Sequence, residues 1–549
     1  MKITRVLFPA LIVMAWPLWG IDVKRFGAIG DGIADDSAAI GKAVSCLKAE
    51  GGGVLDFPKG IYRIGSLQGG PVFAGISNIK INFASGAILL MDNLDQNGNG
   101  GGHGFTFRAP AENIELHNVN IVWKNRPRRR SMGDGIRFEG FPEENKTIRK
   151  ILIDNCRVDG SAQTGAVLMG CSDIIVKNFT VENSWADGLH FNACRNITVD
   201  GVNGVHTGDD TLAFVTYFSP EFSGKIGTVF ALPDLEIWNN SNTIVRRVRV
   251  IGGRANGIRI AGARNLRISD VEVTGKSCGI IIDAGLAGPK HRWQYFASRD
   301  IKIKNARLME CDTGFYVWQF NSSLDNPNFS QFGVICEEFM ISGCKNDSVH
   351  LSGVSGVEIK KFSTTGCRWR FRTFRNCSVK NITIAGAPFL VIGNDTKVNP
   401  SELHKISAND SEFELINIHN GRLEIQKCRG IKFHNVAINN SPAEAILLYL
   451  TLDGDLSNVK ISGVNSENKA RVFACRLLQS QSLDWKNVDV AAAHPLVAVF
   501  EIGGGTAQLR SGNIVIQELN APKLKPVMMQ GGRYAPKNCF VQSATIKRN

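Results

Sequence analysis

A unit of about 23 residues recurs along this 549-residue chain and constrains its fold more than any other feature. Segments such as KILIDNCRV, DIIVKNFTV and RNITVDGV each hold alternating apolar residues next to a polar corner. Lys150, Asp173 and Asn196 mark equivalent positions, each 23 residues after the last. One such unit cannot bury its apolar face alone, so the units are expected to stack on one another.

The length of the unit favours one repeat architecture over the others. Each unit holds short strands with period-two alternation, and few tight-hairpin signals separate them. A β-propeller blade needs about 40 residues and four antiparallel strands. Parallel strands stacked about 4.8 Å apart suit a coil of about 23 residues instead. The sequence therefore predicts an all-β chain that folds as a right-handed parallel β-helix.

The first 80 residues differ from the repeats and predict a leader and a cap. Residues 1–20 carry two basic residues and then an apolar run, which is the layout of a secretory signal peptide. Within residues 21–80, Asp36 to Ala49 has an amphipathic helical pattern, with Asp35 or Asp36 as the N-cap. We expect this short α-helix to cover the open apolar end of the stack, and residues 81–549 to form the β-helix.

The charge of the chain indicates its class of partner. There are 63 lysines and arginines against 50 acidic residues, a formal net charge of +13. In an exported protein this balance favours polyanionic partners, above all acidic polysaccharides. Nucleic acid is not expected, because no aromatic-rich basic module accompanies the charge, and no later segment has the pattern of a membrane span. The run NRPRRR, residues 125–130, is interpreted either as a solvated loop or as a polyanion contact.

The cysteines give no sign of a metal centre. Thirteen of them are scattered between Cys46 and Cys539, without the pairs or the Cys/His spacing of a zinc site. Several end strand-like segments, Cys156 and Cys311 among them. This usage predicts small buried thiols, leaves room for one or two disulfides, and supports neither a metal nor a cofactor.

Three carboxylates fall at matching places in neighbouring units. Asp187 opens DGLHF and Asp210 opens DTLAF 23 residues later, with Asp209 one step before. On adjacent coils these residues would gather at one strand edge, where like charges raise one another's pKa. Glycoside hydrolysis needs such a split between a protonated acid and an ionised base. On spacing alone, strand-end aspartates in Asx turns are an equally good interpretation.

The neighbours of this cluster follow from strand alternation. Leu189 and Phe191 would point inward and His190 outward, on a face that we place around residues 134–320. Arg259 follows His190 by three periods and is expected in the same column, three coils along. The equivalent strand-head positions on this face are Asp134, Thr164, Asp187, Asp210, Asn256, Cys278 and Thr313. Tyr217 and Tyr316 lie in or beside the outward columns, where aromatic rings stack on sugars.

Two stretches resemble a known group of enzymes. VKRFGAIGDGIADDSAAIGKAV with GGGVLDFPKGIY is similar to the N-terminal signature of the pectate-lyase-like β-helix superfamily. WADGLHFNACRNITVDGVNGVHTGDDTLAF resembles the core of family 28 glycoside hydrolases, the polygalacturonase group. In that family Asn-Thr-Asp-Gly is followed by a strand and then by Gly-Asp-Asp about twenty residues later, and the resemblance covers most of residues 22–320.

The resemblance implies an inverting glycosidase that cleaves a polysaccharide. Asp209 would be the general acid, while Asp187 and Asp210 would position and deprotonate the water. Arg259 would bind substrate near the cleavage point. Inversion would require carboxyl groups about 6.5–9.5 Å apart.

Two positions depart from the family pattern. The family's Gly-His-Gly is expected one coil after Asp210, near residue 233, where this chain reads LPDLEIW with Glu236 in the outward column. The family's lysine, which helps to hold a galacturonate carboxylate, is replaced by Ala261. We therefore expect a glycan other than plain pectin, such as another uronic-acid-containing polymer or a bacterial exopolysaccharide. The expected substrate-binding residues are Arg259, His190, Glu236, Tyr217 and Tyr316.

Two other functions stay open on this scaffold. A polysaccharide lyase or uronate epimerase needs a base for the C5 proton and a cation against the carboxylate. Arg259, Tyr217, His190 and a calcium ion held by the aspartates are candidates for these roles. A non-catalytic adhesin or glycan-binding solenoid would use the same face for binding alone. For the enzyme we expect a monomer, secreted or periplasmic, whose partner is an anionic polysaccharide.

Overall fold

A computed structural model describes most of the chain. It covers residues 20–543 apart from 142–145, 219–223, 227–228, 232–238, 286–293, 321–323, 394–408, 465–472, 492–495, 497, 505–510, 522–523, 532 and 534. Nearly all of the expected signal peptide lies outside the described residues, so export stays a prediction. Among the residues that are described, no helix has the length and apolar character needed to cross a membrane.

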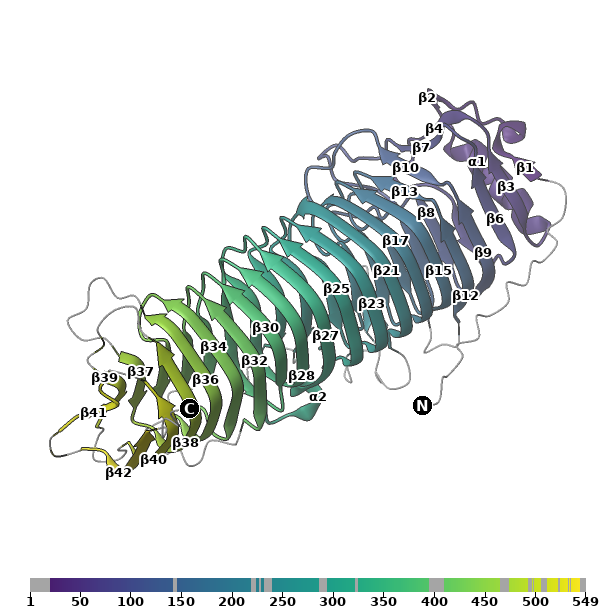
Figure 1. Ribbon diagram of the computed structural model, residues 1–549. Helices are drawn as coiled ribbons and strands as arrows, with labels where there is room; N and C mark the ends of the chain where they lie inside the picture. The colour runs from purple at the N-terminus through teal and green to yellow at the C-terminus, as the bar shows by residue number, and fades with distance from the viewer. Residues whose placement is uncertain are drawn as a thin grey trace, which may run out of the picture.

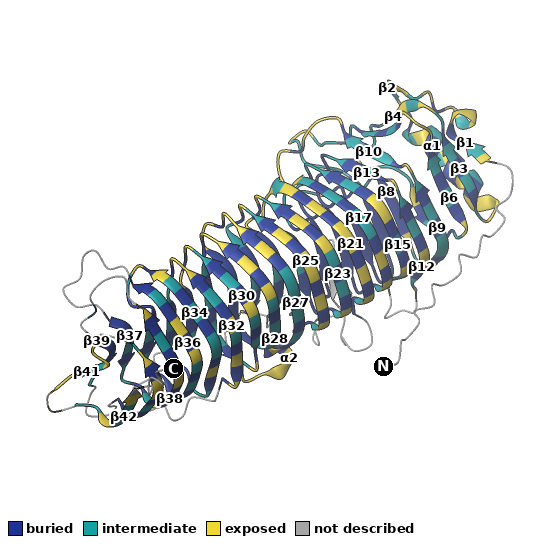
Figure 2. Ribbon diagram, in the orientation of Figure 1, coloured by how far each residue is buried: buried dark blue, intermediate teal, exposed yellow. Residues whose placement is uncertain are grey.

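The described chain winds into one long solenoid of stacked strands (Figure 1). Equivalent strands of successive coils pair in parallel, so that Ile174 lies opposite Ile197 and Leu189 opposite Leu212. Along many of the strands, buried residues alternate with more exposed ones (Figure 2), whereas β16 and β18 are buried at every position. The predicted all-β parallel β-helix is confirmed.

The strands fall into series that run along the solenoid axis. The series that carries the candidate site is β5 (Val72–Ala74), β8 (Phe105–Arg108), β11 (Ile136–Glu139), β14 (Ala166–Met169), β16 (Leu189–Asn192), β18 (Leu212–Val215), β22 (Asn256–Ala261), β24 (Cys278–Ala284), β26 (Thr313–Gln319), the first part of β28 (Asp347–Thr365), β29 (Arg368–Arg375), β31 (Phe389–Ile392), β33 (Leu423–Gln426), β35 (Ile446–Tyr449), β37 (Phe473–Leu478), β39 (Ala498–Ile502) and β41 (Val527–Met529).

The other strands of the ladder build the remaining faces. They are β1 (Gly20–Asp22), β2 (Asp31–Asp35), β3 (Gly53–Phe57), β4 (Gly60–Ile64), β6 (Ile79–Phe83), β7 (Ala87–Met91), β9 (Ala111–His117), β10 (Asn120–Trp123), β12 (Ile148–Asp154), β13 (Arg157–Asp159), β15 (Cys171–Glu182), β17 (Arg195–Thr207), β21 (Ser241–Gly253), β23 (Arg264–Thr274), β25 (Arg299–Met309), β27 (Gln331–Ser342), β30 (Ser378–Ala385), β32 (Ser411–His419), β34 (Ile431–Ser441), β36 (Leu452–Val464), β38 (Gln481–Ala491), β40 (Gly512–Asn520) and β42 (Lys537–Ser543).

The polar corners that recur in the sequence form a hydrogen-bonded ladder. Asn196 Nδ2 donates to Asp173 Oδ1 at 2.9 Å, and Asn265 Nδ2 donates to Asn242 Oδ1 at 3.0 Å. These residues have φ between +50° and +57°, the left-handed region in which Asn and Asp are tolerated better than other residues with a side chain. The corner residues therefore bend the chain and hold neighbouring coils in register.

Inside the coils, equivalent apolar residues stack on one another. Phe191 of β16 and Phe214 of β18 are fully buried, with nearly parallel rings whose centroids are 5.1 Å apart. Burial of a side chain of this size contributes about 1.5–3 kcal/mol. Such stacks set the spacing of the coils and hence the spacing of the strand-head residues on the outer face.

The N-terminal cap contains the expected helix. α1 spans Ser37–Ala49 and follows a short 3-10 helix, η1 (Val23–Phe26). Asp36 stands at the N-cap position, but its carboxylate accepts from the Ile29 N–H of the preceding loop at 2.7 Å rather than from α1. Ile40 is one of four buried residues on the inner face of α1, which covers one end of the solenoid (Figure 1).

The structure corrects the expectation of an additional coil near residue 233. β18 pairs directly with β22, and β17 pairs directly with β21, so one coil spans 46 residues here. Within the segment between them, β19 (Gly224–Ile226) and β20 (Val229–Ala231) form an antiparallel pair apart from the ladder. An insertion can leave the ladder at a corner without changing the strand register, and counting periods cannot detect it. A one-turn helix before β27, α2 (Pro327–Ser330), was also not predicted.

All thirteen cysteines are free, so neither of the disulfides left open by the sequence is present. Eleven are buried, with Cys46 and Cys539 partly exposed. The prediction of small buried thiols is confirmed.

Candidate active site

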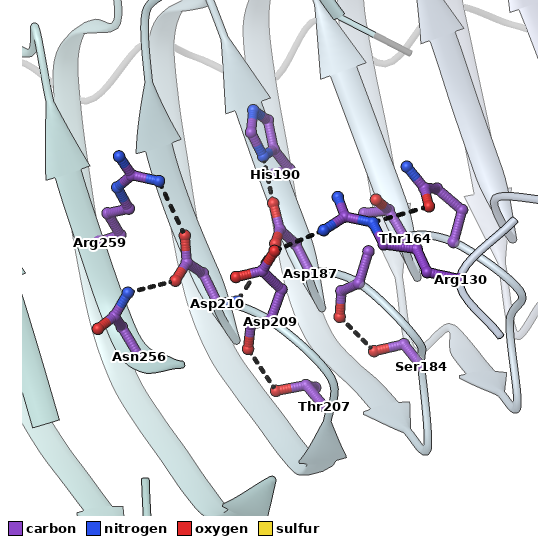
Figure 3. A network of polar contacts seen from close by, with 12 residues as sticks. Arg130, Thr164, Ser184, Asp187, His190, Thr207, Asp209, Asp210, Asn256 and Arg259 are labelled. Carbon is purple, nitrogen blue, oxygen red and sulfur yellow. Dashed lines mark hydrogen bonds and ion pairs between the residues drawn. The ribbon is translucent and has the colours of Figure 1, made fainter. Parts of the chain in front are cut away.

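The three aspartates lie just before β16 and β18, on neighbouring coils (Figure 3). The turn before β18 is held by Thr207, whose Oγ1 donates to the Asp209 carbonyl at 3.2 Å. Ser184 makes the same bond to its own turn one coil earlier, at 2.9 Å. After Asp187 the chain needs glycine, because a Cβ at Gly188 would lie 2.5 Å from the Thr211 carbonyl oxygen. The turns of the repeat thus fix the positions of the aspartates just before β16 and β18.

The carboxylates converge in the way that the repeat predicts. One oxygen of each of Asp187, Asp209 and Asp210 lies within 4.8 Å of the others. The Asp210 N–H donates to Asp187 Oδ1 at 3.2 Å, which ties the two coils together. Asp187 and Asp210 are buried, whereas the Asp209 side chain is 33% exposed. Asp209 is therefore the carboxylate of this cluster that meets solvent most directly.

Each carboxylate has a different polar partner. His190 Nδ1 lies 2.5 Å from Asp187 Oδ2, and Asn256 Nδ2 donates to Asp210 Oδ1 at 2.6 Å. Arg130 Nη1 donates to Asp209 Oδ2 at 2.7 Å. Because the partners differ in charge, the three carboxyl groups are expected to titrate differently.

Asp187 is the member whose charged form is stabilised. Burial opposes ionisation, but the hydrogen bond and attraction of His190, followed by the charges of Arg130 and Arg259, outweigh it. The pKa of Asp187 therefore lies below its ordinary value.

The other two carboxyl groups shift in the opposite direction. Burial and the Asp187 charge raise the pKa of Asp209, although Arg130 partly offsets this. Burial and the same charge raise the pKa of Asp210 well above its ordinary value, against the opposing effect of Arg259. One ionised carboxylate thus stands beside two groups that hold protons more readily.

Arg259 lies in the outward column, but two coils from His190 rather than three. The ladder runs from His190 to Ala213 and then directly to Arg259, because the coil between them carries the insertion. Its guanidinium makes two bonds to Asp283, at 3.0 and 2.8 Å, and its Nη1 lies 4.0 Å from Asp210 Oδ2. It also lies over the ring of Tyr295, 5.1 Å from the centroid. Arg259 therefore balances buried carboxylates here, and its predicted contact with substrate stays a prediction.

The remaining predicted residues lie at different distances from the cluster. The Tyr217 ring is parallel to that of His190, with centroids 6.3 Å apart, and burial raises its pKa. Tyr316 occupies the same column as Arg259, two coils further on, and stacks on His350 at 4.5 Å. Ala261, at the position of the family's lysine, is fully buried. Glu236, with Pro233 and Asp234, lies outside the described residues.

Sequence reasoning missed three charged residues of the site. Arg130 comes from the basic run at 125–130, whose arginines gave no sign of which one reaches the cluster. Lys276, in the turn before β24, is buried and donates from Nζ to the Asp209 carbonyl at 2.8 Å. Asp283 of β24 holds Arg259. Nothing in the spacing of these three residues marks them, because they enter from loops or from other coils.

The cluster also has the spacing of a cation site. Three carboxylate oxygens within 4.8 Å could surround a calcium ion, whose ligands lie at about 2.3–2.6 Å. Arg130, Arg259 and Lys276 already supply positive charge at this place. These three side chains therefore supply part of the positive charge that a cation would bring to the carboxylates.

The inverting outcome that the resemblance implies stays a prediction. Inversion is associated with carboxyl groups roughly 6.5–9.5 Å apart, and the 4.8 Å limit describes one oxygen of each carboxylate rather than the separation of the groups. The same spacing allows one water to bond to two of the carboxylates, because each such bond is about 2.7–2.8 Å long. The geometry thus supports a shared water but not the stereochemical outcome.

Known proteins are similar to parts of this chain. A family model described as the right handed beta helix region matches residues 109–292, which agrees with the predicted hand of the solenoid. Mannuronan C5-epimerase AlgE5 of Azotobacter vinelandii is 42% identical over 82 residues, 14% of this chain and 8% of that protein. Mannuronan C5-epimerase AlgE4 of the same organism is 37% identical over 81 residues, 14% of each protein. The match therefore spans only a small part of these relatives.

Solved structures are similar at low sequence identity. An exopolygalacturonase from Thermotoga maritima is 12% identical, with a TM-score of 0.38 over 77% of this chain and 92% of that one. The AlgE4 A-module of Azotobacter vinelandii is 13% identical, with a TM-score of 0.29 over 95% and 99%. These likenesses carry no argument about function. Membership of glycoside hydrolase family 28 stays a prediction.

Proposed function

We propose that this chain is a glycosidase that hydrolyses an acidic polysaccharide by general acid–base catalysis at Asp187, Asp209 and Asp210. The observation that carries the proposal is the convergence of three carboxylates within 4.8 Å, whose different partners shift their pKa values in opposite directions. Carboxyl groups whose environments push their pKa values apart are suited to the separate roles of acid and base. Asx turns alone would not require three converging carboxylates with different polar partners.

The surroundings of each carboxylate suggest its role. Asp209 is the most exposed and has a raised pKa, which suits the acid that protonates the leaving oxygen. Asp187 is kept ionised by His190, which suits the base that takes a proton from water. Asp210 is close enough to hold the same water. His190 acts through Asp187 and is a positioning residue.

The charge around the cluster supports an anionic substrate. The chain carries a formal net charge of +13. Arg130 reaches the cluster from the basic loop, and the guanidinium of Arg126 lies over the ring of Trp185, 5.1 Å from its centroid. Cations beside an aromatic ring suit a uronic-acid-containing polymer.

A polysaccharide panel tests the proposal. Acidic and neutral polymers are incubated with the protein and scored for new reducing ends and for the ultraviolet absorbance of unsaturated uronates. Asp209→Asn should lower the rate by about 100- to 10,000-fold without changing the fold. Asp300→Asn, at an exposed corner, is the matched control and should keep full activity. A rate for Asp209→Asn close to that of the parent would refute the assignment, and NMR of the new anomer decides between inversion and retention.

A second candidate function is uronate epimerisation or lyase chemistry, which the partial matches to mannuronan C5-epimerases favour. Tyr217 and His190 would then handle the C5 proton, with Arg259 or a calcium ion against the carboxylate. Unsaturated products would indicate a lyase. Altered uronate stereochemistry at unchanged chain length would indicate an epimerase, and dependence on added calcium would return the aspartates to a metal role. Binding without any product would leave a glycan-binding solenoid.

A further inference from the structure

The basic loop at residues 125–130 is anchored beside the cluster. The Pro127 carbonyl accepts a hydrogen bond from the Trp185 indole at 2.8 Å, and the Arg128 N–H donates to the Gly98 carbonyl at 2.9 Å. Ser131, just after the loop, bonds through its N–H to the Ala162 carbonyl at 3.0 Å. These bonds join the loop to several coils, so its last residue is held at one place. The sequence pattern of the run is interpreted as a solvated loop or a polyanion contact, and Arg130 is half exposed while its side chain is bonded to Gln163 and Asp209.

That last residue, Arg130, bridges two partners. Its Nε donates to Gln163 Oε1 at 3.0 Å and its Nη1 donates to Asp209 Oδ2 at 2.7 Å. The side chains of Arg130 and Asp209 are 50% and 33% exposed. Figure 3 shows Arg130 approaching the aspartates from the side opposite to Arg259. The ion pair therefore closes one side of the cluster and faces solvent.

This pair works against the role of Asp209 as an acid. An Arg stays protonated at all ordinary pH values, so Arg130 favours the ionised form of the carboxylate bonded to it and limits the rise in the pKa of Asp209 that burial and Asp187 cause. The charge of Asp187 raises the pKa of Asp209, and Arg130 and Arg259 lower it. Asp210 lies beside them, and its own pKa is raised in part by the charge of Asp209. The Lys276 ammonium group donates a hydrogen bond to the backbone carbonyl of Asp209. Of these cations, Arg130 alone bonds to the carboxylate and is half exposed.

A second carboxylate can take the place of Asp209 on Arg130. Exposed ion pairs contribute little to stability, because water and ions screen them. Guanidinium groups bind carboxylates best through two parallel bonds, which the uronate of a sugar can supply and a neutral sugar cannot.

We propose that Arg130 determines specificity for anionic sugars by exchanging Asp209 for a substrate carboxylate. The uronate binds the guanidinium, and the freed Asp209 takes up a proton from solvent water, which it later donates to the leaving oxygen. A neutral polymer leaves the pair intact, so Arg130 continues to favour the ionised form of Asp209. The inference rests on the proposed function only in using Asp209 as the acid, because the exchange itself is a binding event.

Calorimetric titrations test the exchange separately from the reaction. All proteins carry Asp187→Asn to suppress turnover, and the probes are tetragalacturonate, tetramannuronate and their carboxyl-reduced, neutral counterparts. Arg130→Gln should weaken binding of the acidic probes by about 10- to 100-fold and leave the neutral ones within twofold. Arg129→Gln, in the same loop, is the matched control and should leave the affinities for the acidic and the neutral probes unchanged.

The double variant distinguishes exchange from a simple loss of negative charge. Asp209→Asn should tighten binding of the acidic probes about fivefold in the protein that keeps Arg130. The same substitution should have no effect on binding in the Arg130→Gln background. An equal gain in both backgrounds would overturn the exchange, and so would equal weakening of acidic and neutral probes by Arg130→Gln. Arg130→Lys keeps the charge in a variant closer to the native side chain and should bind the acidic probes with intermediate strength.

Failure of the proposed hydrolysis can be distinguished from failure of the carboxylate exchange. If the polysaccharide panel shows no new reducing ends but the titrations show the coupling, hydrolysis is refuted and the exchange stands as a binding mechanism. If hydrolysis occurs without the coupling, the exchange alone is refuted.

Discussion

Lys276 is buried beneath the cluster at a measurable cost. Only 2% of the residue is exposed, and its Nζ donates to Thr207 Oγ1 at 2.9 Å and to the Asp209 carbonyl at 2.8 Å. Burial lowers its pKa from 10.5 to about 8, although the aspartates oppose the shift. This decrease corresponds to about 3 kcal/mol, since each pKa unit is worth about 1.4 kcal/mol.

The direction of the pH effect follows from the protons that each state binds. Between pH 8 and 10.5 the unfolded chain keeps the Lys276 proton and the folded chain has lost it, so the free energy of unfolding rises with pH through this window. Below pH 8 both states are protonated and the full cost of burial is present. Lys276→Met removes the titration, so the parent should gain about 3 kcal/mol relative to this variant between pH 7 and pH 10.5.

Urea unfolding followed by circular dichroism at pH 7, 8, 9 and 10 measures this difference. The matched control is Lys302→Met, which removes an exposed lysine of β25 and should stay parallel to the parent at all four values. If the stability difference between the parent and Lys276→Met is the same at pH 7 and pH 10, Lys276 does not titrate as its burial requires.

Three further predictions concern the site and the core beneath it. His190→Phe removes the group that stabilises the charged form of Asp187, so the acidic limb of the kcat/KM profile should move to higher pH; an unmoved limb would contradict the role of His190. Asn256→Ala removes the bond to Asp210 and should lower the free energy of unfolding by about 1–3 kcal/mol in urea titrations. Phe191→Ala should cost about 3–5 kcal/mol by the same measurement, since it opens a cavity in a fully buried stack, and a smaller loss would mean that neighbouring coils close the gap.

The repeat period was sufficient to predict the architecture and the core of the site. Stacking requires residues 23 apart to pair, so Asp187 and Asp210 had to be neighbours once the β-helix was recognised. Strand alternation likewise predicted that His190 points out of the core while Leu189 and Phe191 point in. His190 of β16 bonds to Asp187, which stands in the turn just before that strand.

Counting periods gave the wrong coil for residues that follow an insertion. Counting in steps of 23 placed Arg259 three coils from His190, whereas the pairing of β18 with β22 places it two coils away. The position expected for the family's histidine, one coil after Asp210, is accordingly Asn256 and not residue 233. Backbone hydrogen bonds between strands determine the register, and this pairing does not depend on the length of an insertion at a corner between the strands.

Periodicity specifies the positions that repeat, and therefore the solenoid, its inward stacks and the two coils that bring the carboxylates together. The charged residues that shift the pKa values of those carboxyl groups do not recur with the repeat. Arg130 comes from a loop 79 residues before Asp209, and Lys276 from a turn 67 residues after it. Electrostatic effects depend on distance through space and on burial, and neither quantity is set by the spacing of single residues along the chain.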